Sequence, residues 1–521
     1  ILEKMRSLYP EKFASEEDIF SHIHRGDRIF IGTACGEPQY LVKALINYVT
    51  SHPKAFFDAE VLQVWTLGVA PYTDEKFKHN FRHNSFFIGK NTRTAVNEGM
   101  ADYTPISLSQ VPRLLRRKFV PVDVALIQTS PPDKNGYMSL GVSVDITKAA
   151  VENASKIIVQ VNSSMPRVHG ETFLNIKDVD FIIPHEEPLL VFEEVVSDEI
   201  AQKIGAYVAR IVEDGDTIQV GYGSVPNAIL SALRSKKHLG VHTELMSDGI
   251  AQLMKEGVVD NSMKPINRGK SVASFCMGKK ETYEYIHDNP SIEFRPIDYT
   301  NDPHVIAAHR QITAINSCIQ IDLTGQATAE SIGRKFFSGI GGSADFCRNS
   351  YLSILMCPSI AKEGKISAIV PMCPHIDNNE HSVQVIVTDQ GLVVTCAHVV
   401  KGTEPDVRLP DGTRLSAEVV SVHETDDVAF LQLTVALPAG VIPVEFAPSL
   451  GQEGLSVRAF GYPKLGDTDG LYGVGQMVGH VTKAGRARLQ LSFTQVTAGF
   501  SGGPVWNAVS GRVIGMVVEF A

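Results

Sequence analysis

The sequence predicts two similar α/β domains followed by a C-terminal all-β domain. Three observations predict this architecture: a strand, glycine loop and helix that occur twice in the same order, apolar β-rich runs that alternate with helical patterns, and a strand-rich segment beyond Gln390. With 521 residues, the chain is long enough for about three or four domains, each with its own hydrophobic core. We expect the first α/β domain at residues 1–190, the second at 191–388 and the all-β domain at 389–521.

The duplicated pattern covers residues 26–45 (GDRIFIGTACGEPQYLVKAL) and residues 215–233 (GDTIQVGYGSVPNAILSAL). Each copy starts with a Gly-Asp turn and a short apolar strand, and continues with a glycine-containing loop, a proline and an apolar helical pattern. Around the copies, the apolar runs at 122–128, 156–161 and 180–184 alternate with helical patterns, which is typical of parallel α/β sheets. We therefore expect one copy in each α/β domain.

The glycine loop of the second copy is suited to binding an anion. Gly221 and Gly223 let the backbone approach a ligand closely, and Pro226 suits the first turn of the following helix. Because that helix directs free N–H groups at the loop, we expect the loop, including Ser224 and Val225, to contact a negatively charged group. An ordinary turn is the alternative. The loop has neither a G-x-G-x-x-G pattern nor a P-loop lysine, which counts against NAD and ATP.

A second glycine cluster and one acidic residue are further candidates. The segment FSGIGGSADF places Gly341 and Gly342 next to each other, where their backbone N–H groups could bind an oxyanion or a carboxylate. Glu244 lies near the end of a short predicted strand, before a helix that Asp248 can cap. Open α/β sheets place ligand-contacting side chains at such strand ends. A single glutamate in a loop is otherwise most often a solvated surface charge.

Composition and charge exclude several other classes of function. The chain has 48 Lys and Arg against 58 Asp and Glu, a net charge of −10, and its basic residues are scattered, so we expect no nucleic-acid partner. The longest uncharged stretch, residues 428–444, contains two prolines and is shorter than the ~20 residues that span a bilayer, so we expect no membrane anchor. Seven cysteines without a CxxC pair or Cys/His metal spacing predict a reducing cytoplasm and no metal site.

The same segments resemble the acetyl-CoA hydrolase and CoA-transferase family, which includes 4-hydroxybutyrate and succinyl-CoA:acetate CoA-transferases. The resemblance lies within residues 1–390 and rests on GTACGEPQYLV, VDVALIQTSPPDKNGYMSLGVSVD, IQVGYGSVPNAIL, GVHTELMSDG, IDLTGQATAES and SGIGGSADF. It implies two similar α/β domains, as the duplication does. It also implies that Glu244 is the nucleophile, that the loop at 221–226 contacts CoA, and that Gly341 and Gly342 supply backbone amides to the site.

The chemistry that the resemblance implies is covalent, with acyl-CoA as a substrate and no permanently bound cofactor. Transfer of CoA to a second carboxylic acid and hydrolysis of the thioester by water are both activities of the family, and the sequence leaves both open. The sequence up to residue 337 is similar to 4-hydroxybutyrate-type members, whereas the sequence from residue 341 onward is more similar to the succinyl-CoA:acetate subgroup. Acetyl-CoA is the substrate common to both.

Beyond Gln390, the segments GLVVTCAHVV, DDVAFLQL and AGFSGGPVW resemble the His, Asp and Ser motifs of trypsin-like serine peptidases of the bacterial HtrA-like type. The resemblance implies a double β-barrel in which His398 is the base, Asp427 orients it and Ser501 is the nucleophile. The junction near residues 388–392 is expected to shorten both partners, and only 20 residues follow Ser501. We therefore expect an incomplete double barrel with little or no peptidase activity.

Three functions follow from these observations. The leading hypothesis is a CoA-transferase or acetyl-CoA hydrolase that acts on small-molecule acyl-CoA and carboxylic acids. The first alternative is a trypsin-like serine endopeptidase whose N-terminal region is a sensor or scaffold. The second alternative is a fusion protein that binds CoA without turnover. A homodimer is one assembly compatible with each hypothesis, and the sequence does not decide the oligomeric state.

Overall fold

The computed structural model describes residues 1–55, 57–192, 198–322, 326–361, 366–370 and 373, and nine separate strands between residues 385 and 516. The chain divides into two compact units. The first consists of Ile1–Asp198, Val212–Ser317 and Ala329–Ile354, and the second of Glu199–Ile211, Cys318–Thr328 and Leu355–Ala521. Every candidate site residue of the α/β region lies in the first unit. The domain boundaries expected at residues 190 and 388 stay predictions.

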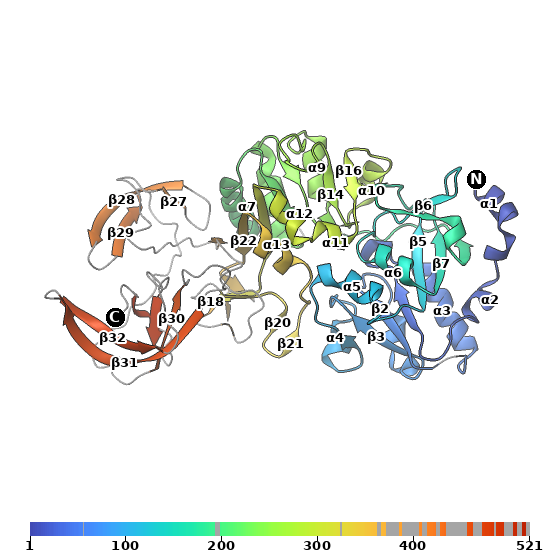
Figure 1. The fold of residues 1–521 in the computed structure, drawn as a ribbon, viewed down its shortest axis with the longest axis horizontal. Helices are drawn as coiled ribbons and strands as arrows, with labels where there is room; N and C mark the ends of the chain where they lie inside the picture. Colours follow the sequence, from blue (N-terminus) through green and yellow to red (C-terminus); the bar gives the residue numbers. More distant parts are fainter. Residues whose placement is uncertain are drawn as a thin grey trace. The chain divides into compact units, whose positions relative to one another are not determined.

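The first α/β region is built on a seven-stranded sheet with the order β10-β7-β5-β1-β2-β3-β4, in which every pair of neighbours is parallel. Figure 1 shows this sheet in blue to green, with its helices beside it. The strands are β1 (Arg28–Ile31), β2 (Ala59–Gln63), β3 (Phe81–Ser85), β4 (Asp102–Tyr103), β5 (Val124–Thr129), β7 (Lys156–Val161) and β10 (Phe181–Pro184). The helices are α1 (Leu2–Leu8), α2 (Glu16–Phe20), α3 (Gln39–Ser51), α4 (Arg93–Asn97), α5 (Val111–Arg116) and α6 (Thr147–Asn153).

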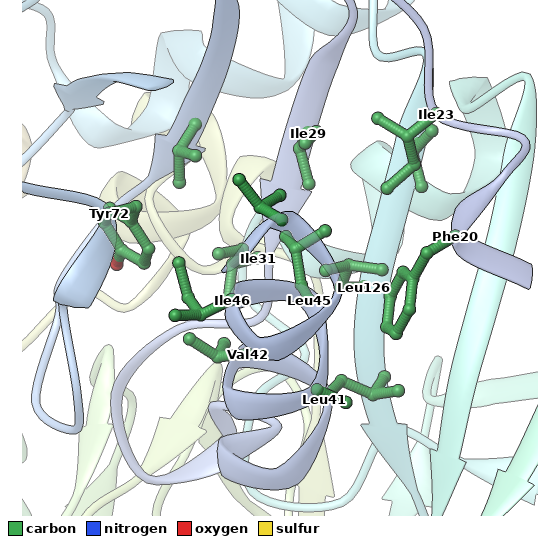
Figure 2. Packing of buried hydrophobic residues seen from close by; sticks show 14 of the residues in the cluster. Phe20, Ile23, Ile29, Ile31, Leu41, Val42, Leu45, Ile46, Tyr72 and Leu126 are labelled. Atoms are coloured by element: carbon green, nitrogen blue, oxygen red, sulfur yellow. The ribbon is translucent and has the colours of Figure 1, made fainter. Parts of the chain in front are cut away.

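Helix α3 is fixed to this sheet by its apolar face. Leu41, Val42 and Leu45 are fully buried, at the spacing that places side chains on one side of a helix. Figure 2 shows Leu45 beside Ile31 of β1 and Leu126 of β5, and Leu41 and Val42 belong to the same buried cluster. The N-terminus of α3 has no side-chain cap, and a cap is worth only ~1 kcal/mol, whereas each fully buried aliphatic side chain contributes about 1.5–3 kcal/mol. Packing therefore holds α3, and with it the glycine loop that precedes it.

The second α/β region repeats the plan with a smaller sheet of order β12-β11-β17, which continues to β22. The pairs β11–β12 and β11–β17 are parallel, as the duplication predicts. The strands are β11 (Thr217–Val220), β12 (Gly240–Val241), β17 (Ile312–Ser317) and β22 (Leu352–Met356). The helices are α8 (Ser224–Ala232), α9 (Asp248–Lys255), α10 (Lys280–Ile286), α11 (Ile297–Thr300), α12 (Pro303–Ala308) and α13 (Ser343–Asn349).

Four small sheets complete the described part of the first unit. One of them, with the parallel order β14-β16-β8, joins a strand of the first α/β region to two strands of the second. Its strands are β8 (His169–Gly170), β14 (Ser271–Ala273) and β16 (Ile292–Phe294). The other three are the pairs β6 (Tyr137–Ser139) with β9 (Phe173–Asn175), β13 (Leu245–Met246) with β15 (Phe275–Cys276), and β20 (Ser331–Ile332) with β21 (Lys335–Phe336).

The described elements of the second unit before residue 371 are one helix and five short strands: α7 (Glu199–Ile211), β18 (Gln320–Asp322), β19 (Ala327–Thr328), β23 (Ile360–Ala361), β24 (Ile366–Ser367) and β25 (Ile369–Val370). The later strands are β26 (Val385–Val387), β27 (Asp406–Arg408), β28 (Arg414–His423), β29 (Val428–Leu433), β30 (Ser456–Gly461), β31 (Leu471–Lys483), β32 (Arg486–Phe493), β33 (Pro504–Asn507) and β34 (Val513–Met516). Strands β27 to β29 pair antiparallel, as do β30 to β34 in the order β32-β31-β30-β33-β34. The predicted double barrel stays a prediction, because the segments that connect these strands lie outside the described residues.

The six cysteines in the described ranges are free thiols, and all six are buried. Within the described ranges, no three or more His, Cys, Asp or Glu side chains lie together in a way that could hold a metal ion. Among the described helices, none combines the length and the apolar composition that a membrane span requires.

Strand β8 depends on a glycine because it approaches another backbone closely. Gly170 has a φ of +107°, and a Cβ at this position would lie 2.2 Å from the carbonyl oxygen of Phe294 in β16. A backbone oxygen within a parallel pair cannot move aside without breaking the sheet. Gly257 is a matched comparison, because its φ is +75° but a Cβ there would meet nothing within 4 Å.

We expect Gly170→Ala to lower the free energy of unfolding more than Gly257→Ala does. Both variants carry the ~1–2 kcal/mol strain of a positive φ, and only the first adds overpacking, typically worth about 1–3 kcal/mol. Chemical denaturation of the two variants and the wild type measures the difference. Equal losses of stability would contradict the close approach of β8 and β16.

Candidate active site

Glu244 lies in the short segment between β12 and β13, and its backbone is held firmly. The carbonyl oxygen of Glu244 accepts hydrogen bonds from the N–H groups of Ser274 at 2.8 Å and Phe275 at 3.0 Å. The hydroxyl of Thr243 donates to the carbonyl oxygen of Val220 at 3.3 Å, so the Thr243 side chain lies towards β11, whereas the Glu244 side chain contacts Asn301.

One buried amide bridges the Glu244 carboxylate to a second carboxylate. Asn301, which directly follows α11, donates from Nδ2 to Oε1 of Glu244 at 2.5 Å and to Oδ2 of Asp345 at 3.2 Å. An amide nitrogen carries two hydrogens, so both are used. Asp345 lies in the first turn of α13 and also accepts from the N–H of Ser109 at 3.4 Å. Two acidic side chains from distant parts of the chain are therefore held beside one another.

The protonation of Glu244 is shifted by these surroundings. The pKa of Glu244 is raised to about 7: burial raises it most, the hydrogen bond from Asn301 lowers it, and the negative charge of Asp345 raises it. Burial also raises the pKa of Asp345. A carboxylate with a pKa near neutrality is more basic than an ordinary glutamate, and it titrates in the range where enzymes operate.

Of the two adjacent glycines predicted from the sequence, Gly342 lies directly against this carboxylate. A Cβ at Gly342 would lie 1.6 Å from Oε1 of Glu244 and 2.2 Å from Nδ2 of Asn301, so no other residue fits there without displacing both side chains. Gly341 has a φ of +56°, and its carbonyl oxygen accepts from the N–H of Leu108 at 2.9 Å. The glycine pair thus brings backbone, rather than a side chain, to the face of the carboxylate.

The glycine loop predicted to bind an anion connects β11 to α8. Gly221 has no room for a side chain, because a Cβ would lie 2.8 Å from Oδ1 of Asn316. Gly223 has a φ of +135°, and a Cβ there would meet only the Pro226 ring, at 3.7 Å. Ser224 is the first residue of α8, and Val225 is buried in its first turn. The loop therefore has the glycine-dependent backbone and the helix start that the sequence predicts.

A row of aromatic side chains links this loop to the glycine pair. The ring of Tyr222, which stands between the loop glycines and is 45% exposed, lies 4.9 Å from the ring of Trp65. The Trp65 ring lies 5.4 Å from that of Phe87, and the Phe87 ring lies 3.2 Å from the position of a Cβ at Gly341. The first α/β region thus supplies the aromatic surface between two loops of the second.

Two residues at the site were missed by the sequence analysis. Asp345 belongs to the segment SGIGGSADF, in which the sequence pattern points only to the glycines. Asn301 lies in the sequence DYTNDPH, which reads as a turn before a helix and carries no signal of a site. The predicted residues Glu244, Gly341 and Gly342 are brought together by the fold. His398, Asp427 and Ser501 lie outside the described residues.

Comparison with known families gives three matches along the chain. The acetyl-CoA hydrolase/transferase N-terminal domain matches residues 2–193, and the C-terminal domain of the same family matches residues 278–401. A trypsin-like peptidase domain matches residues 385–516. The last two matches share residues 385–401, which include the junction expected near residues 388–392.

Two curated proteins and one solved structure illustrate the similarity. The chain is 41% identical over 393 residues to a 4-hydroxybutyrate coenzyme A transferase of Clostridium kluyveri, covering 74% of this chain and 91% of that protein. It is 37% identical to a succinyl-CoA:acetate/propanoyl-CoA:succinate CoA transferase of Fasciola hepatica, covering 76% of this chain and 80% of the other. RipA from Yersinia pestis superposes with a TM-score of 0.69 at 33% identity, covering 74% of this chain and 90% of that chain.

These similarities confirm the family predicted from the sequence and the α/β fold of its two domains. They also confirm the resemblance of the C-terminal segment to trypsin-like peptidases. The chain belongs to the acetyl-CoA hydrolase/transferase family of enzymes, with a trypsin-like peptidase segment at its C-terminus.

Proposed function

We propose that this chain transfers CoA between acetyl-CoA, or a similar acyl-CoA, and a small carboxylic acid, with Glu244 as the covalent nucleophile. The observation that carries the proposal is the contact between the Glu244 carboxylate and the backbone of Gly342, a position that admits no side chain. The two curated relatives are CoA transferases by name, which supports the reaction class. The acceptor acid stays open, since their names give different acids.

In the proposed reaction, CoA passes from the donor acyl group to the Glu244 carboxyl group and then to a second acid. A Glu244 oxygen attacks the thioester carbon, the C–S bond breaks, and an acyl-glutamyl anhydride and CoA thiolate form. The thiolate then attacks the glutamyl carbon, the C–O bond breaks, and the first acid leaves with a glutamyl-CoA thioester remaining. A second carboxylate reverses both steps. The backbone N–H groups of Gly341 and Gly342 are the proposed donors to the oxyanion of each tetrahedral intermediate.

The loop at 221–226 is the proposed contact for CoA. Its glycines admit close approach of a ligand, and the first N–H groups of α8 favour a negatively charged group such as a phosphate. The aromatic row of Tyr222, Trp65 and Phe87 extends from this loop towards the glycine pair. An acyl-CoA bound at the loop could therefore reach Glu244 with its thioester along an apolar surface.

Two alternatives remain distinct from this proposal. The trypsin-like match at residues 385–516 favours a serine endopeptidase, in which His398, Asp427 and Ser501 would act and the α/β region would be a sensor or scaffold. A non-catalytic CoA-binding protein would use the loop at 221–226 without covalent chemistry. Hydrolysis of acetyl-CoA differs from transfer only in the final acceptor, which is water.

We expect Glu244→Ala to abolish CoA exchange while CoA binding stays measurable. Removal of a covalent nucleophile typically costs several orders of magnitude in kcat. Borohydride treatment during exposure to acyl-CoA should reduce the glutamyl-CoA thioester and modify residue 244 of the wild type, as mass spectrometry of peptides would show.

The control for this experiment is Ser501→Ala, which should exchange CoA at the wild-type rate. CoA binding by a wild-type protein that shows no exchange would support the non-catalytic alternative. Full exchange by Glu244→Ala would end the proposed mechanism.

We expect kcat/KM for exchange to fall about tenfold per pH unit below pH 7, because only the ionised Glu244 attacks and its pKa is raised to about 7. Asp345→Asn removes a negative charge that raises this pKa. The acidic limb of the profile of kcat/KM against pH should therefore move to lower pH. Asp74→Asn, at an exposed position, is the matched control and should leave the limb in place. An acidic limb that moves upward in Asp345→Asn would contradict the electrostatic coupling of the two carboxylates.

We expect Gly223→Val to weaken CoA binding by more than its loss of stability explains. A side chain at φ +135° strains the backbone and also occupies the space that the ligand would approach. Gly269→Val has a similar strain, at φ +75° with nothing within 4 Å of a Cβ, and should bind CoA normally. Calorimetric titration with CoA and thermal unfolding of both variants provide the comparison. Unchanged CoA affinity in Gly223→Val would leave the loop as an ordinary turn.

A further inference from the structure

His242 lies two residues before Glu244, and the two side chains contact neighbouring residues, Thr300 and Asn301 respectively. The ring nitrogen Nε2 of His242 is 2.8 Å from the carbonyl oxygen of Thr300. A carbonyl oxygen can only accept a hydrogen bond, so the ring must carry its proton on Nε2. The Thr300 carbonyl belongs to the residue directly before Asn301, the source of the amide that holds Glu244.

The surroundings of His242 keep its imidazole neutral. The ring is fully buried, and burial together with the charges of His309 and Lys264 places its pKa well below the ordinary value. The ammonium of Lys264 is held by the carbonyl oxygens of Val241 and Lys270, at 2.8 and 2.7 Å. The centroids of the neutral rings of Tyr299 and Phe346 lie 6.4 and 6.1 Å from that of the imidazole. A neutral ring with its proton on Nε2 is therefore the form that this site selects.

The Nε2 bond to Thr300 is the interaction that orients this ring. Nδ1 of His242 has no hydrogen-bond partner among the residues that the structure describes. The centroid of the His309 ring lies 4.4 Å from that of the His242 ring. Nδ1 of His309, however, bonds to the Val305 carbonyl oxygen in its own helical turn, at 2.9 Å. His309 thus resembles His242 in burial and chemistry, yet makes no bond to the segment that carries Asn301.

A closed ring of contacts runs from His242 to Glu244. Besides its carbonyl contact, Thr300 places its hydroxyl 2.7 Å from Oγ of Ser274, 3.2 Å from Oδ1 of Asn301 and 3.3 Å from the carbonyl oxygen of Ile297. The nitrogen end of the Asn301 amide faces the carboxylates, to which it donates both of its bonds. His242 and Glu244 are joined through one intervening residue on one side and through Thr300 and Asn301 on the other.

We propose that His242 is a positioning residue for the Glu244 carboxylate: its Nε2–H fixes the Thr300 carbonyl and so directs the Asn301 amide at Glu244. The inference rests on the proposed function, because it assigns His242 a role in the reactivity of that carboxylate. In this proposal, His242 acts neither as a general acid nor as a general base. Its consequence is that loss of this one donor impairs the chemical step and changes the pKa of Glu244, while acyl-CoA binding persists.

The test compares four variants by steady-state CoA exchange, pH profile and thermal unfolding. His242→Phe keeps a ring but removes the donor, and kcat should fall about 100-fold with little change in KM, as a displaced reacting group causes. Since the Asn301 hydrogen bond lowers the pKa of Glu244, the acidic limb of His242→Phe should move to higher pH. His242→Gln places an amide donor at similar reach and should regain roughly tenfold in kcat, the worth of one ordinary hydrogen bond.

His309→Phe and His242→Asn are the controls. His309→Phe removes an equally buried imidazole and should lose stability without losing kcat or moving the acidic limb. His242→Asn has a donor that is too short to reach Thr300 and should be as slow as His242→Phe. If His242→Phe does not fold, the kcat values of His242→Gln and His242→Asn decide the inference in the same way.

Wild-type kcat and an unmoved acidic limb in His242→Phe would overturn the inference, as would Gln and Asn variants of equal activity. These results are distinguishable from failure of the proposed function, in which the wild type itself would not exchange CoA.

Discussion

The proposed site depends on one constraint: a single buried amide serves two carboxylates. Asn301 donates one hydrogen to Glu244 and the other to Asp345, so one amide orients both carboxylates. The bond from Asn301 favours the ionised form of Glu244, whereas burial and the charge of Asp345 favour the protonated form. The balance holds the carboxylate near its titration point, where it is both basic and substantially ionised.

The fold builds the rest of the site around this constraint by placing short loops at the ends of strands from both α/β regions. Glu244 follows β12, the glycine loop follows β11, and Trp65 follows β2 in the first sheet. Glycine at 342 then lets the backbone approach the carboxylate where any Cβ would collide with it. The rigid parts of the chain, such as α3 packed on β1 and β5, carry no proposed chemistry, but they determine where these loops begin and end.

The sequence predicted much of this arrangement because the relevant signals are local. The duplicated pattern at 26–45 and 215–233 gave the two α/β regions, and glycines needed for close approach were visible as residue types. Asn301 was not predictable, because its role arises from a contact between segments 57 positions apart and its own sequence context is that of a turn. His242 lies within the recognised segment GVHTELMSDG, yet its bond to a backbone carbonyl leaves no pattern in the sequence.

Oxygen transfer tests the central claim, covalent catalysis by Glu244, most directly. In the proposed reaction, an acceptor acid attacks glutamyl-CoA and leaves one of its carboxylate oxygens on the glutamyl group when CoA departs with the new acyl chain. With acetyl-CoA and ¹⁸O-labelled acceptor acid in unlabelled water, the peptide that contains residue 244 should gain ¹⁸O, and the released acid should acquire it in later turnovers. Exchange that proceeds while this peptide stays unlabelled would contradict the account.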